Sequence, residues 1–485
     1  MKNLKILSLF LIVSVFFSVM APSASALSDP ATYSVSIILL EPDSGSVLFS
    51  KDENVRAYPA STTKIMTVLL AIEAIEDGRA SLTDMVTASA SMNYDLVADG
   101  SSAGILVGET MSLQDLLYCA MLSSGNDACN VIAEYIGGTI DNFITMMNDR
   151  AQELGCVGTH FANTHGLPDE NHYTTAYDLA QITLEAMTHS QFMDICDTVT
   201  YEVPATNMSG ARTLSNSNGL INENSTMYPG YKYEYAHGIK TGHTNDAGYC
   251  LVSTAEKDGV QLVCIVLGGV VINTDVGLQY SNFVDSVALY EWGFNNFSFQ
   301  DILTPEDSIG TAAVSMGSDG DDSVPLNPQN TVTAFLPNDT QADSLQYDIT
   351  LYDPDETGAL RAPISSGDVL GEVTVSIDGV NYGTVNIVAG SSVGLSKLVF
   401  IRTALGDFFG MTWVKIVAAI LIVLLVLYII SVVTYRRRRR RYIRYMRAKQ
   451  AAERRERDAA QRSQPQDPVT PQQVSRDYFE EFFKH

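Results

Sequence analysis

The chain has 485 residues, and its 56 acidic side chains against 30 basic ones give a formal net charge of −26 at pH 7. This length exceeds one ordinary domain, so we expect two or three. From residue 27 to 410 there are 49 acidic and only 12 basic residues, which excludes the basic surface that a nucleic-acid-binding domain needs.

The first 26 residues have the three parts of a secretory signal peptide. Lys2 and Lys5 provide the positive start, residues 6–20 form an apolar run, and Ala24-Ser25-Ala26 is a small-residue cleavage site. The sequence therefore predicts that residues 1–26 are removed and that the mature chain begins near Leu27, outside the cytoplasm.

Residues 27–298 have the pattern of one domain in which strands come first, helices follow and strands return. The expected segments are strands at 32–40 and 45–50, a helix from Ser61, helices between 113 and 190, and strands between 238 and 271. Asp258-Gly259 marks a tight hairpin turn. This order predicts an α+β fold, an antiparallel sheet with a helical lobe.

The character of the chain changes near residue 300, where the helical pattern ends. Short alternating segments such as TVTAFLP and GEVTVSIDG follow, separated by Gly, Asp, Ser and Pro. We expect a small all-β domain at residues 301–395. It contains no cysteine or histidine, so we interpret it as a stalk or an interaction module.

A second apolar run, residues 413–434, is long enough to cross a bilayer as a helix. Six arginines, Arg436 to Arg441, follow it directly and predict that this end is cytoplasmic. Residues 435–485 carry 15 basic and 7 acidic side chains. The sequence thus predicts a single-pass membrane protein with an extracellular body and a basic cytoplasmic tail. We consider two hypotheses for the tail, a cytoplasmic protein partner and contact with anionic lipid.

The six cysteines show no Cys-x-x-Cys spacing, and each lies in an apolar helix or strand pattern. We therefore favour buried free thiols over disulfides. The spacing of His160, His165 and His172 fits no helical pair of zinc ligands. We expect no metal and no cofactor.

The stretch YPASTTKIMT places Ser61 three residues before Lys64, at the start of an apolar helix. Positions i and i+3 share a helix face, so the two side chains can touch. A serine hydroxyl needs a base to act as a nucleophile, and a lysine serves only when burial or a nearby cation lowers its pKa. An ordinary helix cap is the alternative interpretation of this pair.

Two further motifs follow. Ser124-Gly125-Asn126 lies between two expected helices, and Lys240-Thr241-Gly242 opens an expected strand. Taken alone, the first motif is also typical of a turn followed by a helix cap. The second is also typical of an exposed edge strand on which a lysine prevents pairing with another chain. The three motifs in this order are the signature of penicillin-binding proteins and serine β-lactamases.

From residue 32 to 297 the chain resembles the low-molecular-mass D-alanyl-D-alanine carboxypeptidases in particular. The resemblance rests on YPASTTKIMT, SSGNDAC, FANTHGL, TTAYDLA and GIKTGHTNDAGYCL, and it continues into the β-domain at LRAPISSGDVLGEVTVSIDG. It implies a serine peptidase that removes the terminal D-alanine from peptidoglycan stem peptides and that is acylated by β-lactams such as penicillin.

The resemblance also implies residue roles. Ser61 would be the nucleophile and Lys64 its base, while Ser124 would relay a proton and Asn126 would bind the substrate amide. The remaining residues belong to the strand motif: Lys240 and Thr241 would hold the terminal carboxylate, Gly242 would leave room for it, and the backbone N–H of His243 would join that of Ser61 in the oxyanion hole. The charge of Lys240 would also help to keep Lys64 neutral.

Three alternatives stay open at the level of the sequence. A D,D-endopeptidase or transpeptidase shares the acyl-enzyme, and a β-lactamase shares the fold but needs fast deacylation. A sensor that is acylated slowly and signals through the span to the tail is the alternative outside enzymes. The full span also departs from this family, whose members commonly anchor through an amphipathic surface helix.

Overall fold

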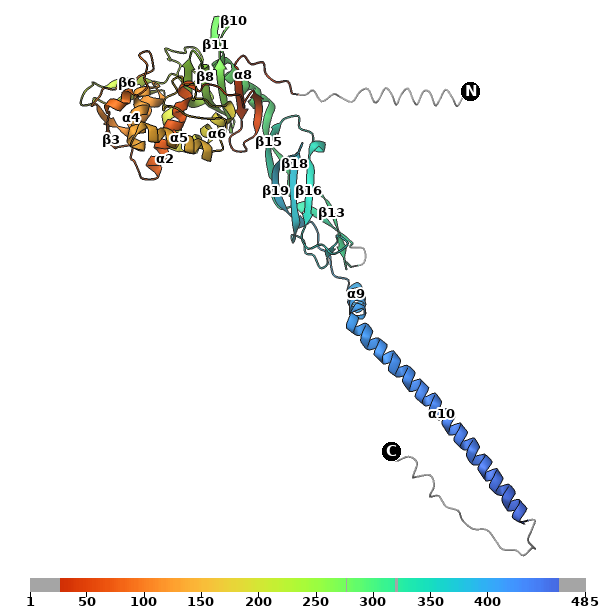
Figure 1. Ribbon diagram of the computed structural model, residues 1–485. Helices are drawn as coiled ribbons and strands as arrows, with labels where there is room; N and C mark the ends of the chain where they lie inside the picture. Colours follow the sequence, from red (N-terminus) through yellow and green to blue (C-terminus); the bar gives the residue numbers. More distant parts are fainter. Residues whose placement is uncertain (1–26, 276, 319–321, 462–485) are drawn as a thin grey trace, which may run out of the picture. The chain divides into compact units, whose positions relative to one another are not determined.

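The structure is a computed structural model that describes residues 27–275, 277–318 and 322–461 (Figure 1). Two compact units account for them. The first runs to Ile309 and also includes Asn327–Leu351 and Leu370–Ile387; the second is formed by Gly310–Leu326, Tyr352–Val369 and the chain from Val388 onward. The expected signal peptide and the last 24 residues, 462–485, lie outside the described residues.

A five-stranded sheet in the order β2-β1-β9-β8-β7 is the centre of the first unit, and its pairs are antiparallel. Its strands are β1 (Ser36–Leu40), β2 (Val47–Lys51), β7 (Ala236–Thr244), β8 (Gly248–Lys257) and β9 (Val260–Gly269). The predicted turn at Asp258-Gly259 joins β8 to β9, and both residues have the positive φ that such a turn needs.

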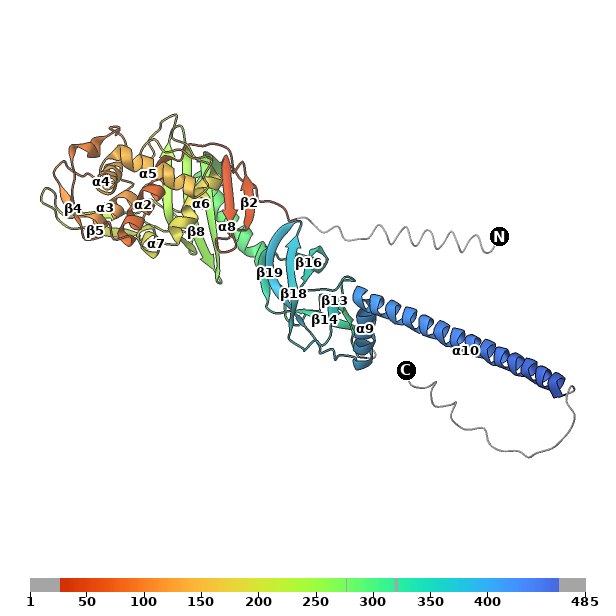
Figure 2. The same cartoon turned by 60° about the horizontal axis from the view of Figure 1, so that its bottom comes forward.

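Alternate residues of the sheet enter two separate cores, because successive side chains of a strand point to opposite faces. Ile38 and Leu40 of β1 pack into the core of the helical lobe, whereas Ile37 and Leu39 pack against helix α8 (Ser281–Asn296). Figure 2 shows the helices of the lobe beside the sheet. Both faces are therefore covered, and the α+β prediction is confirmed.

The helical lobe surrounds α2 (Lys64–Glu76), whose side chains are buried on every side except at its end. This explains its apolar run, since a helix without a polar face is a core helix. Around it lie α3 (Leu113–Met121), α4 (Asn126–Gly137), α5 (Ile140–Glu153), α6 (Ala176–Met187) and α7 (Ser190–Cys196).

Short elements complete this part of the chain. They are the 3₁₀ turns η1 (Ala60–Thr63) and η2 (Ala90–Asn93), and the two-stranded pairs β3–β4 (Met85–Thr87, Thr110–Ser112), β5–β6 (Thr200–Val203, Arg212–Ser215) and β10–β11 (Val271–Thr274, Gly277–Tyr280). All six cysteines are buried and free, as the sequence favoured.

The chain after residue 297 is built of strands, as predicted. In the first unit, β12 (Phe297–Leu303) pairs with β15 (Val332–Pro337), and β16 (Gln346–Leu351) pairs with β18 (Val369–Ile377), which neighbours β19 (Val380–Ala389). In the second unit, β13 (Gly310–Ser315) pairs with β14 (Ser323–Pro328) and β17 (Leu360–Arg361). A 3₁₀ turn, η3 (Ala342–Ser344), precedes β16.

Two helices end the described chain. The sequence did not predict α9 (Lys397–Gly410), but it did predict the apolar part of α10 (Thr412–Gln461). Helix α10 is long and apolar enough to cross a membrane, and none of its apolar window is buried. It therefore fits a membrane anchor.

Candidate active site

Ser61 and Lys64 meet at the junction of η1 and α2. Ser61 lies in the 3₁₀ turn, Lys64 is the first residue of the helix, and Lys64 Nζ is 2.9 Å from Ser61 Oγ. The predicted contact across one helical turn is therefore present.

The amine of Lys64 has two further partners in the core. Nζ lies 2.8 Å from Asn126 Oδ1 and 2.7 Å from the backbone carbonyl of His165. Burial lowers the pKa of Lys64 to about 8, although nearby Cys129 and Asp127 favour the charged form. A lysine in this state is close to giving up its proton near neutral pH.

Ser124 and Asn126 come from the loop and helix start between α3 and α4. Ser124 adopts a positive φ of 59°, and its buried Oγ has no hydrogen-bond partner among the described residues. The backbone N–H of Asn126 donates to Ser101 O at 2.9 Å. An unpaired buried hydroxyl is costly, so a ligand or water is the expected partner of Ser124.

Strand β7, the edge of the sheet beside η1, carries the third motif. Lys240 is fully buried and its Nζ donates to Thr241 O at 2.9 Å. Burial, and then the charge of Lys64, lowers the pKa of Lys240 to about 7. Burial is the larger cause for both lysines. Repulsion between two ammonium groups is mutual, so the prediction that Lys240 helps to keep Lys64 neutral stays a prediction.

Gly242 allows β7 to approach η1 closely. A Cβ atom at this position would lie 3.1 Å from the backbone nitrogen of Ser61 and 3.2 Å from Ala60 Cβ, tighter than ordinary van der Waals contact. The next residue, His243, stacks on Tyr249 with ring centroids 4.2 Å apart, and burial lowers the pKa of its imidazole.

A cavity of about 660 Å³ brings the three motifs together. Six of the eight predicted residues line it, namely Ser61, Ser124, Asn126, Thr241, Gly242 and His243. The two lysines are buried behind its wall, Lys64 against Ser61 and Lys240 against the backbone of Thr241. The cavity therefore has a hydroxyl surface backed by two amines of lowered pKa, which suits serine acyl transfer.

The family models agree with this geometry. Residues 23–270 match the model described as D-alanyl-D-alanine carboxypeptidase, and residues 297–394 match the C-terminal domain of penicillin-binding protein 5. The chain belongs to the D-alanyl-D-alanine carboxypeptidase family. The family and the serine-peptidase class predicted from the three motifs are confirmed.

Two relatives of this carboxypeptidase family span most of the chain. D-alanyl-D-alanine carboxypeptidase DacF of Bacillus subtilis (strain 168) is 29% identical over 82% of this chain and 97% of its own length. DacA of Escherichia coli (strain K12) is 31% identical over 71% of this chain and 79% of its own. Among solved structures, penicillin binding protein 5 from Haemophilus influenzae is 29% identical, with a TM-score of 0.55 over 76% of this chain and 100% of its own.

The sequence did not reveal how this carboxypeptidase fold holds the loop of residues 99–105 beside the cavity. The carboxylate of Asp127 accepts hydrogen bonds from Ser102 Oγ at 2.6 Å, Ala103 N at 2.9 Å and Ile105 N at 3.1 Å. The residues just before them, 99–101, line the cavity. Asp127 follows Asn126 directly, but nothing in the sequence pairs it with this loop.

The three histidines considered as zinc ligands are used separately. His172 Nε2 lies 2.7 Å from Thr63 Oγ1 and its Nδ1 accepts from Ala162 N. His160 Nδ1 lies 2.6 Å from Asn171 O, and His165 Nδ1 accepts from Leu167 N at 3.3 Å. Within the described ranges, the metal-like cluster is another one, made of Glu73, Glu185 and His189. The guanidinium of Arg150 already bonds both of its carboxylates.

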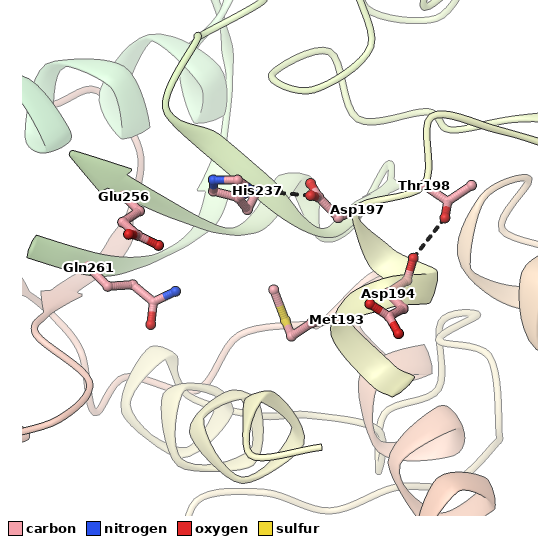
Figure 3. A pocket seen from close by; sticks show the side chains of 7 residues that line it. All are labelled: Met193, Asp194, Asp197, Thr198, His237, Glu256 and Gln261. Carbon is pink, nitrogen blue, oxygen red and sulfur yellow. Dashed lines mark hydrogen bonds and ion pairs between the residues drawn. The ribbon is translucent and has the colours of Figure 1, made fainter. Parts of the chain in front are cut away.

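A second cavity of about 430 Å³ lies away from the motifs, beside α7 and the start of β7 (Figure 3). Its lining residues are Met193, Asp194, Asp197, Thr198, His237, Glu256 and Gln261. Asp197 and His237 are paired at 3.1 Å. Because none of the predicted site residues reaches it, the active-site assignment remains with the larger cavity.

Proposed function

We propose that this enzyme releases the terminal D-alanine from peptidoglycan stem peptides ending in D-Ala–D-Ala through an ester on Ser61, and that β-lactams form the same ester. One observation carries the proposal, the set of partners around Lys64 Nζ. Two of them, the carbonyl oxygens of Asn126 and His165, can only accept. Only the third, the hydroxyl of Ser61, can donate.

This set fits a neutral amine. Its two N–H groups would donate to the two carbonyl oxygens, which leaves the nitrogen lone pair directed at the Ser61 hydroxyl. Ser61 Oγ then attacks the carbonyl carbon between the two D-alanines, and its proton passes to Lys64 Nζ. General-base assistance of this kind contributes about 10²–10⁴-fold to a rate.

The attack leaves a negative charge on the carbonyl oxygen of the substrate. The backbone N–H groups of Ser61 and His243 are proposed to stabilise it, and the close approach of Gly242 to Ser61 N supports that position. Removal of one such donor costs about 10²–10³ in rate.

Collapse of the tetrahedral intermediate breaks the C–N bond, and the leaving D-alanine needs a proton. Ser124 is proposed to relay it from Lys64, because its buried Oγ has no other partner among the described residues. Water then attacks the ester, and its proton passes to Lys64, with Ser124 as the relay. As the ester bond breaks, Lys64 returns a proton to Ser61 Oγ and the free enzyme is restored. Asn126 is proposed to bind the substrate amide and to orient Lys64.

The end of the cavity at Thr241 is proposed to bind the terminal carboxylate, with Lys240 supplying positive charge from behind. The anchor helix is proposed to cross the membrane once, with the catalytic cavity outside. The six arginines after the apolar span support a cytoplasmic tail. A protein partner or anionic lipid remains the proposed contact of that tail.

The test is D-alanine release from a pentapeptide ending in D-Ala–D-Ala, with a labelled penicillin as a second probe of Ser61. The wild-type enzyme is expected to release D-alanine and to carry the label, and Ser61→Ala to do neither. Penicillin labelling without peptide hydrolysis would overturn the carboxypeptidase proposal in favour of a sensor. Hydrolysis of cross-linked dimers alone would favour an endopeptidase, and rapid loss of the label would favour a β-lactamase.

A further inference from the structure

A second hydroxyl accompanies Thr241 at the proposed carboxylate end of the cavity. Ser217 Oγ lies 2.7 Å from Thr241 Oγ1, and both residues line the cavity. Lys240 does not line it, since its buried Nζ is bonded to the backbone oxygen of Thr241. A ligand at this end therefore meets two hydroxyls first and a positive charge behind them.

Ser217 is held in place by the two asparagines that flank it. Asn216 Nδ2 donates to Cys196 O at 3.1 Å and to Thr198 O at 3.0 Å. Asn218 Nδ2 donates to Gly238 O on β7. Both asparagines are almost fully buried, so the segment is fixed to α7 on one side and to the motif strand on the other.

The backbone of Ser217 is held as well. Its N–H donates to Leu122 O at 3.2 Å, beside the loop that carries Ser124. Its carbonyl accepts from Ser225 Oγ at 3.1 Å. With both flanks and both backbone groups bonded, the backbone that carries the Ser217 side chain is held in place, and its hydroxyl contacts Thr241 Oγ1. Such pre-organisation reduces the entropy that a bound ligand must overcome.

We propose that Ser217 is a substrate-binding residue that donates a hydrogen bond to the terminal carboxylate of the stem peptide, as the partner of Thr241. This inference rests on the proposed function of the same cavity. A carboxylate presents two acceptor oxygens, and each hydroxyl has one proton to donate. In the free enzyme one of these protons serves the contact between the hydroxyls; a bound carboxylate would take both.

The hydroxyls of Ser217 and Thr241 and the amine of Lys240 would have different roles, because only the amine changes its charge near neutral pH. Lys240 has a pKa of about 7 in the free enzyme, so only part of the enzyme carries a protonated Lys240 at neutral pH. Two neutral hydroxyls keep their protons over this whole range. Ser217 and Thr241 would therefore fix the carboxylate geometrically, while the negative charge of the substrate would favour the protonated form of Lys240.

The experiment compares two matched acyl donors on the full-length enzyme in detergent. Both are D-alanyl thioesters; in one the leaving group carries a free carboxylate, and in the other that carboxylate is methylated. Ser217→Ala is expected to lower kcat/KM for the free carboxylate by about 10–100-fold, the range of a hydrogen bond to a charged group. The methylated donor should change less than about threefold.

Two further variants separate recognition from folding. Ser217→Thr keeps the hydroxyl and is expected to restore the preference for the free carboxylate. Ser215→Ala removes the same side chain two residues earlier, outside the cavity lining, and is expected to leave the ratio of the two donors unchanged.

An equal loss of kcat/KM with both thioesters in Ser217→Ala would overturn the inference. It would show a general disturbance of the site, which lowers the rate with or without a free carboxylate. An unchanged kcat/KM with both donors would overturn it too. The proposed function fails on a different result, D-alanine release that survives Ser61→Ala. Failure of the inference and failure of the proposed function therefore give different results.

Discussion

Lys64 and Lys240 are both fully buried, and the charge of Lys64 adds to burial in lowering the pKa of Lys240. Lys64 is proposed to act as a neutral base and Lys240 as a charged group. Yet the pKa of Lys64, about 8, is higher than that of Lys240, about 7. The proposed active form, neutral Lys64 with charged Lys240, is therefore a minority species whose population depends on pH.

The pH dependence of acylation is the first prediction. Raising the pH deprotonates Lys64 and creates the base, but it also removes the charge of Lys240. We expect kcat/KM to be bell-shaped with a maximum between the pKa values of about 7 and about 8, which belong to the coupled pair as a whole. Initial rates from pH 5 to 10 would measure it.

Lys240→Arg is the matched variant, since a guanidinium stays charged over this range. Its profile is expected to rise through the pKa of Lys64 and then level off, without the alkaline fall. A fall that persists in Lys240→Arg would assign the alkaline limb to another group.

Asp127→Asn is predicted to loosen the wall of the cavity. The amide would present N–H atoms to a loop that now donates to both carboxylate oxygens from Ser102, Ala103 and Ile105. A buried donor left without an acceptor costs about 1–3 kcal/mol. We expect a lower melting temperature and a higher KM for the peptide substrate, because residues 99–101 of the same loop line the cavity.

Asp115→Asn is the control for this loss of stability. Asp115 is also a buried acid, but its partners are the cap residue Ser112 and the hydroxyl of Tyr201, and it does not line the cavity. It should lower the melting temperature while leaving KM within about twofold. Equal kinetic losses in both variants would show that instability alone explains the effect.

The sequence predicted the contact between Ser61 and Lys64 better than the packing around it. Ser61 and Lys64 are three residues apart, so helix geometry alone brings them together. Contacts such as Asp127 with Ile105 or Ser217 with Thr241 join segments more than 20 residues apart. They depend on how loops cross the finished fold, which no local periodicity encodes. Helix α9 was missed because Gly406 and Gly410 interrupt a short apolar segment beside a far stronger one.

Arg212 and Glu109 form a buried ion pair in which the carboxylate side chain is completely inaccessible. Arg212 also donates to the carbonyls of Ala103 and Gly104. Removal of one partner leaves an uncompensated charge, so Arg212→Met is expected to destabilise the fold by about 3–5 kcal/mol. Thermal unfolding of the full-length protein in detergent would report the loss.

The double variant Arg212→Met/Glu109→Leu removes both charges and is expected to recover much of this stability. A double variant as unstable as Arg212→Met alone would mean that the hydrogen bonds of the two side chains carry the effect rather than the ion pair. These are the bonds of Arg212 to the loop carbonyls and those that Glu109 accepts from Thr206 Oγ1 and Leu106 N.

Gly166 is predicted to tolerate no side chain, because it lies against the turn that presents Ser61. Its φ is +93°, and a Cβ atom there would fall 1.8 Å from Ala60 O and 2.8 Å from Thr63 Oγ1. These atoms belong to η1, so Gly166→Ala must push the nucleophile turn away from its place.

Gly78→Ala provides the matched control, since Gly78 also has a positive φ, +73°, but open space around its Cβ position. Backbone strain is expected to lower the stability of this control by only about 1–2 kcal/mol, and penicillin labelling should stay complete. Gly166→Ala is expected to lose labelling, or to fail to fold; normal labelling of Ser61 in this variant would show that η1 is not fixed by this contact.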